Sequence, residues 1–256
     1  MSIPPLAVIT GASGGIGREL AKQLSQKGYR VGLIARRQAE LEAAVKECGG
    51  EGTAAFAVAD VTDKDQCTKA LATLATAFKN QPIDVLVNNA GRGLTHKPSE
   101  ATVEQAEDMM KVNVHSVIHM TNAVLPTMKA RKDDPTAKTQ IVNVSSILGR
   151  IAENAPQRAF YSGAKHFLNA YSESLRAELK SDFPNITIST VSPGPISTDF
   201  GTNAGGGPSK DIPGVQQTED CVKAIVDLIV NRKEECYTDP SWYEKVMNVL
   251  SGYGKP

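Results

Sequence analysis

The chain has 256 residues and a balanced charge, with 28 Lys and Arg residues against 28 Asp and Glu residues. This length is enough to bury the core of one α/β domain, so no domain boundary is required. The neutral charge and an aromatic content of 5% disfavour a nucleic-acid-binding module.

The cysteines and the hydropathy pattern bear on the cellular compartment. The four cysteines are widely spaced and lack the spacing of metal ligands, so we expect reduced thiols in an intracellular protein and no metal site. The start of the chain lacks a signal-peptide pattern, and no run of 18 apolar residues occurs. We expect a cytoplasmic protein without a membrane segment, although removal of a membrane anchor would leave the same pattern.

Six short apolar runs rich in β-branched residues are typical of buried parallel strands. They lie at residues 6–10, 29–35, 53–59, 83–88, 140–145 and 186–191. Amphipathic stretches of helical length separate them, for example residues 18–28 and 63–78. This alternation predicts an α/β fold with one parallel sheet covered by helices on both faces. In such a sheet, ligands bind beyond the carboxyl ends of the strands.

A glycine-rich turn, TGASGGIG (residues 10–17), follows the first predicted strand and leads into a helix. Gly11 permits a tight turn, Gly15 lets the backbone approach a pyrophosphate, and Gly17 lets the helix pack close to the strand. A purely structural turn would also have this composition. Its place between a strand and a helix favours a dinucleotide site.

The second predicted strand ends at Ala35, where an enzyme that uses NAD would carry a carboxylate for the adenosine ribose. Arg36 and Arg37 follow instead, and guanidinium groups there favour the 2′-phosphate of NADP. Ser13, inside the glycine turn, can donate to the same phosphate. The alternative is that the two arginines only begin a surface helix.

Tyr161 and Lys165, in the stretch AFYSGAKHF (159–167), share one face of a predicted helix. On its own, this pair is most simply a core ring beside a solvated charge. A tyrosine, with a reference pKa of about 10, becomes an acid–base catalyst near neutral pH only if cations stabilise its phenolate. Lys165 is placed to do so.

Taken together, the motifs resemble those of the short-chain dehydrogenase/reductase family, in its shorter single-domain form. They are TGASGGIG, Asp60, NNAG (88–91), Asn113, NVSS (143–146), YSGAK (161–165) and SPGPIST (192–198), in the family's order over residues 6–240. The resemblance implies a Rossmann-like, three-layer α/β/α fold of about seven parallel strands, a nicotinamide cofactor, and hydride exchange between a ketone and a secondary alcohol.

The resemblance also implies residue roles. Tyr161 would be the general acid or base, Lys165 would tune it and hold the nicotinamide ribose, and Asn113 would position a water for a proton relay. The second serine of the pair, Ser146, would orient the carbonyl, with Ser145 as the alternative. The implied cofactor-binding residues are Gly11, Ser13, Gly15, Ile16, Gly17, Arg36, Arg37, Asp60, Val61, Asn88, Ala90, Gly91, Tyr161, Lys165, Pro193, Gly194, Ile196 and Thr198.

Two features depart from the family pattern. The segment from Ser146 to Tyr161 is two residues longer than expected, and residues 150–160 carry Glu153, Asn154, Gln157 and Arg158 where apolar residues are common. The glycine turn also has Gly14 where some relatives that use NADP have a basic residue. The first departure concerns the substrate pocket rather than the chemistry.

We therefore expect one domain over residues 1–256, acting as an NADP(H)-dependent oxidoreductase on a small-molecule ketone or secondary alcohol. The alternatives are an NAD-dependent alcohol dehydrogenase of the same family and a dinucleotide-binding regulatory protein without catalysis. Residues 199–217 are predicted to form a mobile substrate loop, because Gly205 to Gly207 are costly to order. By resemblance, we expect a homodimer or homotetramer through helices near 103–131 and 160–182.

Overall fold

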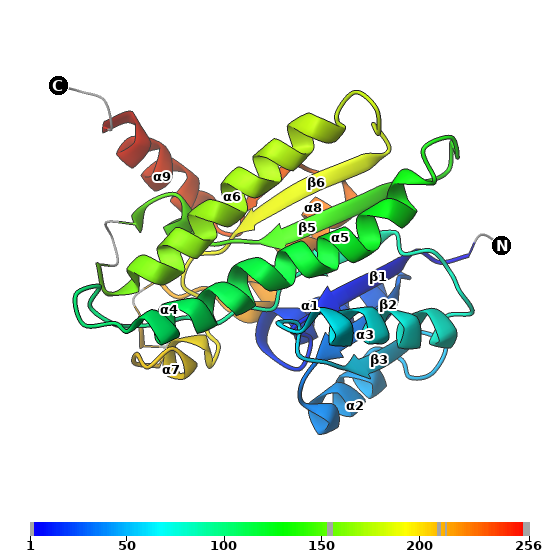
Figure 1. Cartoon of the computed structure of the whole chain (residues 1–256), viewed down its shortest axis with the longest axis horizontal. Coiled ribbons are helices and arrows are strands. Elements are labelled where there is room, and N and C mark those ends of the chain that lie inside the picture. Colours follow the sequence, from blue (N-terminus) through cyan, green and yellow to red (C-terminus); the bar gives the residue numbers. More distant parts are fainter. Residues whose placement is uncertain (1–2, 153–155, 209–210, 213, 253–256) are drawn as a thin grey trace.

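The centre of the protein is a sheet of seven parallel strands in the order β3-β2-β1-β4-β5-β6-β7 (Figure 1). The structure is a computed structural model that describes residues 3–152, 156–208, 211–212 and 214–252. The strands are β1 (Leu6–Thr10), β2 (Arg30–Ala35), β3 (Ala54–Val58), β4 (Val85–Asn88), β5 (Thr139–Val144), β6 (Ile186–Ser192) and β7 (Glu235–Tyr237).

Helices cover both faces of the sheet (Figure 1). They are α1 (Gly15–Gln26), α2 (Gln38–Glu47), α3 (Lys64–Ala77), α4 (Val103–Met110), α5 (Ser116–Lys129), α6 (Ala159–Leu179), α7 (Phe200–Asn203), α8 (Thr218–Val230) and α9 (Pro240–Gly252). In Figure 1, α3, α5 and α6 lie in front of the sheet and α8 lies behind it. The predicted Rossmann-like three-layer fold is confirmed.

Alternate residues of each strand feed two separate hydrophobic cores. Ile9 of β1 packs with α1, α2 and α8 on one face, whereas Val8 packs with α3, α5 and α6 on the other. Because both faces are covered, β1, β2 and β4 are buried along nearly their whole length, which is why they appear in the sequence as continuous apolar runs.

Each of the six predicted apolar runs coincides with a strand to within two residues at either end. The seventh strand, β7, has only three residues and begins at the exposed Glu235, so hydropathy does not mark it. α1 begins at Gly15, three residues before the predicted start, because the glycine turn itself forms the first helical turn.

The described residues also bear on the predictions about the cysteines and about a membrane segment. Cys48, Cys67, Cys221 and Cys236 are all free thiols, and the first three are buried. Within this part of the chain, no helix combines the length and the apolar character needed to cross a membrane.

The order of the sheet places the site. The chain runs outward from β1 to β3 and then returns to pair β4 against the other side of β1. The segments that follow β1 and β4 therefore flank the point where the strand order reverses, which is where open α/β sheets bind ligands.

Candidate active site

The glycine turn after β1 is closely packed. A Cβ at Gly17 would lie 2.5 Å from the carbonyl oxygen of Gly11, so only glycine lets α1 come this near to the turn. Gly11 has a φ of +67° and lies against the backbone of Ala90, the residue that follows β4. Gly15 is exposed and faces Thr198, from which a Cβ would be separated by 3.5 Å. The turn thus leaves its backbone open toward the segment that follows β6.

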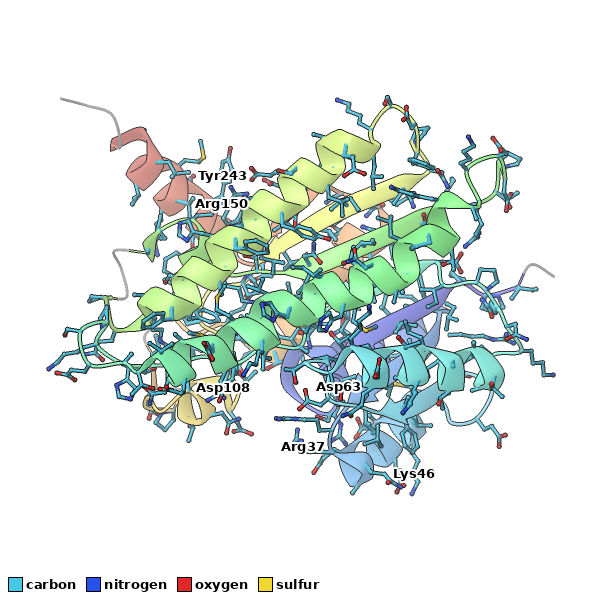
Figure 2. All side chains as sticks on the ribbon, viewed as in Figure 1. Arg37, Lys46, Asp63, Asp108, Arg150 and Tyr243 are labelled. Atoms are coloured by element: carbon cyan, nitrogen blue, oxygen red, sulfur yellow. The ribbon has the colours of Figure 1, made fainter. Side chains whose placement is uncertain are left out.

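Arg37 completes the surface of this turn. Its Nη2 atom donates to the Ser13 hydroxyl at 3.1 Å and to the Ser13 carbonyl oxygen at 3.1 Å, and it lies 3.0 Å from where a Cβ of Gly14 would be. A basic side chain therefore covers Gly14 although the residue itself is glycine. Arg37 is exposed at the molecular surface (Figure 2).

Arg36 lies beside a carboxylate. Its Nη1 atom is 3.8 Å from Oδ2 of Asp60, and 76% of its side chain is exposed. Asp60 also accepts hydrogen bonds from the backbone N–H and the hydroxyl of Thr62, which fix its orientation after β3. The next residue, Val61, is buried. The arginines and Asp60 therefore meet at the same edge as Ser13.

The NNAG segment ties the site to the sheet. The Asn88 amide is buried and donates to Asn143 Oδ1 at 2.9 Å and to the Thr121 hydroxyl at 3.2 Å. Its side chain therefore joins β4 to β5 and α5, and the backbone of Ala90 and Gly91 is the part of this segment nearest the turn.

Asn89 was not singled out from the sequence. Its side-chain amide donates to the Thr10 carbonyl oxygen at 2.9 Å, and the Thr10 hydroxyl accepts from the backbone N–H groups of Asn89 and Ala90. These contacts lock the glycine turn against the end of β4. Its position in NNAG, directly after a predicted strand, is the feature of the sequence that could have indicated this role.

The SPGPIST segment follows β6 and closes the site on the other side. Ile196 forms a parallel bridge with Gln216, and Thr198 accepts a hydrogen bond from the Phe200 backbone. Pro193 is buried, and Gly194 is packed against the indole of Trp242 from α9. Trp242 was also missed, because nothing in the sequence links α9 to this loop.

Tyr161, Lys165 and the two serines converge at the ends of β5 and α6. Tyr161 forms a hydrogen bond with Ser146, and Lys165 Nζ lies 5.7 Å from the centre of the Tyr161 ring. The Ser145 hydroxyl instead donates to the Lys165 carbonyl oxygen at 3.2 Å. Ser146 thus faces the phenol, and Ser145 holds the helix backbone.

Asn113 lies in a π-helical turn, Lys111–His115, between α4 and α5. Such turns replace one α-helical turn and are frequent at functional sites. The Asn113 amide donates to the carbonyl oxygens of Arg92 and Met109, whereas its Oδ1 is buried without a partner among the described residues. Both Asn113 Oδ1 and Lys165 Nζ lie close to Gly91. Asn113 therefore presents a free acceptor toward Lys165.

Burial governs the protonation of the pair. It lowers the pKa of Lys165 to about 8, and the ammonium group donates to the Val144 carbonyl oxygen at 2.8 Å. Burial also raises the pKa of Tyr161, while the Ser146 hydrogen bond and the positive charge of Arg158 act to lower it. This arrangement can hold a proton on the Tyr161 oxygen and deliver it to an oxygen placed beside Ser146.

The residues fit a dinucleotide. The turn at Gly15 is a cradle that any Cβ would narrow, Ser13 and Arg37 offer donors at its edge, and the orphaned Asn113 acceptor lies beside Lys165. Bound there, a nicotinamide cofactor would supply or accept a hydride.

Solved structures share this fold. A short-chain dehydrogenase/reductase from Burkholderia phymatum in complex with NAD superposes with a TM-score of 0.83 at 21% identity, covering 96% of this chain and 94% of that one. An alcohol dehydrogenase from Thermococcus sibiricus complexed with 5-hydroxy-NADP has a TM-score of 0.75 at 24% identity, covering 91% of this chain and 95% of that one. At these identities, the likeness concerns the fold.

Comparison with known sequences assigns the chain to a family. Mouse dehydrogenase/reductase SDR family member 7B is 34% identical over 204 residues, covering 78% of this chain and 60% of that protein. An uncharacterized oxidoreductase of Staphylococcus epidermidis is 32% identical over 202 residues, covering 78% of this chain and 82% of its own. The chain thus spans about three fifths of the length of the mouse relative. The family model for short chain dehydrogenases matches residues 5–207, and the chain belongs to the short-chain dehydrogenase/reductase family.

Proposed function

We propose that this protein is an NADP(H)-dependent oxidoreductase that interconverts a ketone and a secondary alcohol. The observation that carries the proposal is the convergence of Ser146 and Lys165 on the buried Tyr161, with the unpaired Asn113 acceptor behind Lys165. Membership of an oxidoreductase family supports the reaction class.

In the reductive direction, the carbonyl oxygen accepts a hydrogen bond from Ser146 and the proton of the Tyr161 hydroxyl. The carbonyl carbon gains a hydride, so that one C–H bond and one O–H bond form as the C=O double bond becomes single. Lys165 and Asn113 then return a proton to the phenolate from solvent. In the oxidative direction, the Tyr161 phenolate takes the proton of the alcohol.

The choice of NADP rests on the guanidinium groups at the end of β2. Arg37 already holds Ser13 in place, and Arg36 stands beside it at the surface. Charge-assisted hydrogen bonds from these groups to a 2′-phosphate favour NADP over NAD. Ala35 belongs to the apolar core around β2, so no carboxylate stands there to repel the phosphate.

We also propose that the protein forms a homodimer or homotetramer through α4, α5 and α6. A mainly apolar groove of about 510 Å³ runs between α4 and the start of α6, lined by residues that include Val103, Met110 and Phe160. Leu168 and Leu175 of α6 are buried within the chain, whereas Phe167 is 39% exposed. Light scattering at micromolar concentration tests this, and a monomer would rule it out.

The central test is a screen of ketones and secondary alcohols with each cofactor, followed by absorbance of the reduced nicotinamide. Tyr161→Phe is the matched variant, because it keeps the ring and removes only the transferable proton. We expect its kcat to fall by at least about 100-fold while NADP(H) binding persists. Turnover equal to that of the wild type would refute the proposed acid–base role.

A further inference from the structure

The mouth of the candidate active site is formed by three segments that are hydrogen-bonded to one another. The Thr95 backbone N–H donates to the Ala204 carbonyl oxygen at 2.9 Å, and the His96 N–H donates to the Gln157 carbonyl oxygen at 2.8 Å. The Phe200 ring packs against the Tyr161 ring with centroids 5.5 Å apart. Residues 93–96, 156–158 and 199–206 therefore surround the side of Tyr161 on which a substrate must enter.

Arg158 brings a cationic side chain to this mouth. It is the N-cap residue of α6 and stands three residues before Tyr161. It is half-buried, and among the described residues it forms neither an ion pair nor a side-chain hydrogen bond. Asp199 is the one carboxylate within the three segments, and no ion pair joins it to Arg158. A partly desolvated guanidinium without a counter-ion is costly unless a ligand pairs with it.

A second polar group points to the same place. The Thr95 hydroxyl oxygen is buried and has no hydrogen-bond partner among the described residues. A Cβ at Gly206 would lie 3.3 Å from this oxygen and 3.5 Å from Nη2 of Arg158. A guanidinium and a hydroxyl thus converge above Gly206, and together they present the donors that a carboxylate accepts.

We propose that Arg158 and the Thr95 hydroxyl bind the carboxylate of the substrate, so that the physiological ketone is an oxo acid and its product a hydroxy acid. This inference rests on the proposed function and deepens it by naming the substrate class. The apolar ring of Phe200 covers the carbon chain between the carboxylate and the carbonyl. Arg158 acts in this reaction as a specificity residue.

The test compares straight-chain oxo acids, with one to four carbons between the two groups, with their methyl esters. Each pair has the same reactive ketone and differs in charge. For at least one chain length, we expect kcat/KM of the wild type to be at least about tenfold higher for the acid. Arg158→Gln should remove this preference, so that kcat/KM falls at least about tenfold more for the acid than for its ester.

Three variants sharpen the result. Arg158→Lys should retain part of the preference, because it keeps the charge without the bidentate geometry. Thr95→Val should lose a smaller part, about threefold to tenfold. Lys97→Gln removes an exposed charge two residues from Thr95 and should leave the preference unchanged. An ester that reacts as well as its acid at every length would overturn the proposal, as would equal losses for both in Arg158→Gln.

Failure of the proposed function gives a different pattern. If no carbonyl compound reacts with either cofactor, the oxidoreductase proposal fails, and calorimetry of pentanoate binding to the protein with NADP⁺ decides the carboxylate site separately. Weaker binding by Arg158→Gln than by the wild type supports the site. Equal binding, or none to either protein, refutes it.

Discussion

The turn after β1 and the pocket around Tyr161 are built in different ways. The turn is held mainly by backbone contacts. Gly11 and Gly17 let β1, α1 and the NNAG segment approach one another closely, and the Asn89 side-chain amide donates to the main-chain carbonyl oxygen of Thr10. The pocket consists of buried polar side chains, several of which are only partly satisfied, such as Asn113 and Thr95. The first region depends on the absence of side chains, and the second depends on their chemistry. Substitutions should therefore impair shape in the turn and proton transfer in the pocket.

The largest effect is expected from separating the two serines of the pocket. Ser146→Ala should lower kcat by about 100- to 1,000-fold, because it removes the donor that faces Tyr161. Ser145→Ala removes a bond to the Lys165 carbonyl oxygen and should cost about 1 kcal/mol of stability with less than a tenfold loss in kcat. Steady-state kinetics and urea unfolding measure the two effects. Equal losses of kcat would contradict the assignment of Ser146.

The protonation of Lys165 gives a prediction of stability against pH. Its folded-state pKa of about 8 lies below the ordinary value of 10.5, so the unfolded chain binds more protons between these pH values. Burial of the charged Lys165 ammonium group destabilises the folded protein. This destabilisation is complete below pH 8 and decreases as the pH rises toward 10.5. Relative to Lys165→Met, the wild type should gain up to roughly 3 kcal/mol of unfolding free energy over that range.

Urea unfolding at pH 7.5, 9 and 10, without cofactor, is the measurement. Lys46→Met, at an exposed position of α2 (Figure 2), is the matched control and should show no such trend. A difference between wild type and Lys165→Met that stays constant with pH would show that Lys165 is not held in a desolvated environment.

Much of this contrast follows from the sequence, but not all of it. Gly11, Gly17, Tyr161 and Lys165 belong to local motifs whose spacing carries their geometry. The hydrogen bond from Asn113 to Arg92, the packing of Trp242 on Gly194 and the convergence of Thr95 with Arg158 each join segments distant in the sequence. Local periodicity holds no information on such contacts, because tertiary packing decides them.

The cofactor preference tests whether the arginines beside the glycine turn recognise the negative charge of the 2′-phosphate. We expect a preference for NADP(H) over NAD(H) of about tenfold to 100-fold in kcat/KM, reduced by screening at this exposed edge. Ala35→Asp combined with Arg36→Ser should invert it. Arg36→Gln and Arg37→Gln each should lower NADP(H) affinity with little change for NAD(H).

Arg30→Gln, at the opposite end of β2, is the control and should leave the ratio of the two cofactors unchanged. If the wild-type protein binds both cofactors equally, or prefers NAD, then Arg36 and Arg37 are only surface charges and do not select the cofactor.

The smallest effect is expected in the proposed substrate loop, residues 199–217, of which 209–210 and 213 lie outside the described residues. Hydrogen bonds between the Ser197 N–H and Gln216, and between the Gln216 N–H and Pro195, hold its two ends together. NADP(H) should slow hydrogen exchange of the amides in 199–208 by about tenfold, and leave the amides of β5 unchanged. Identical exchange in the loop with and without cofactor would argue against a lid.

Trp242 is the only tryptophan among the 256 residues, and its indole rests on Gly194 in the loop that follows β6. The tryptophan fluorescence of the protein therefore originates at one known position beside the proposed nicotinamide site. A bound reduced nicotinamide absorbs where this indole emits, so excitation at the indole band gives an optical readout of occupancy that needs no label and no turnover. Every variant of the pocket can be checked in this way for cofactor binding before its rate is measured.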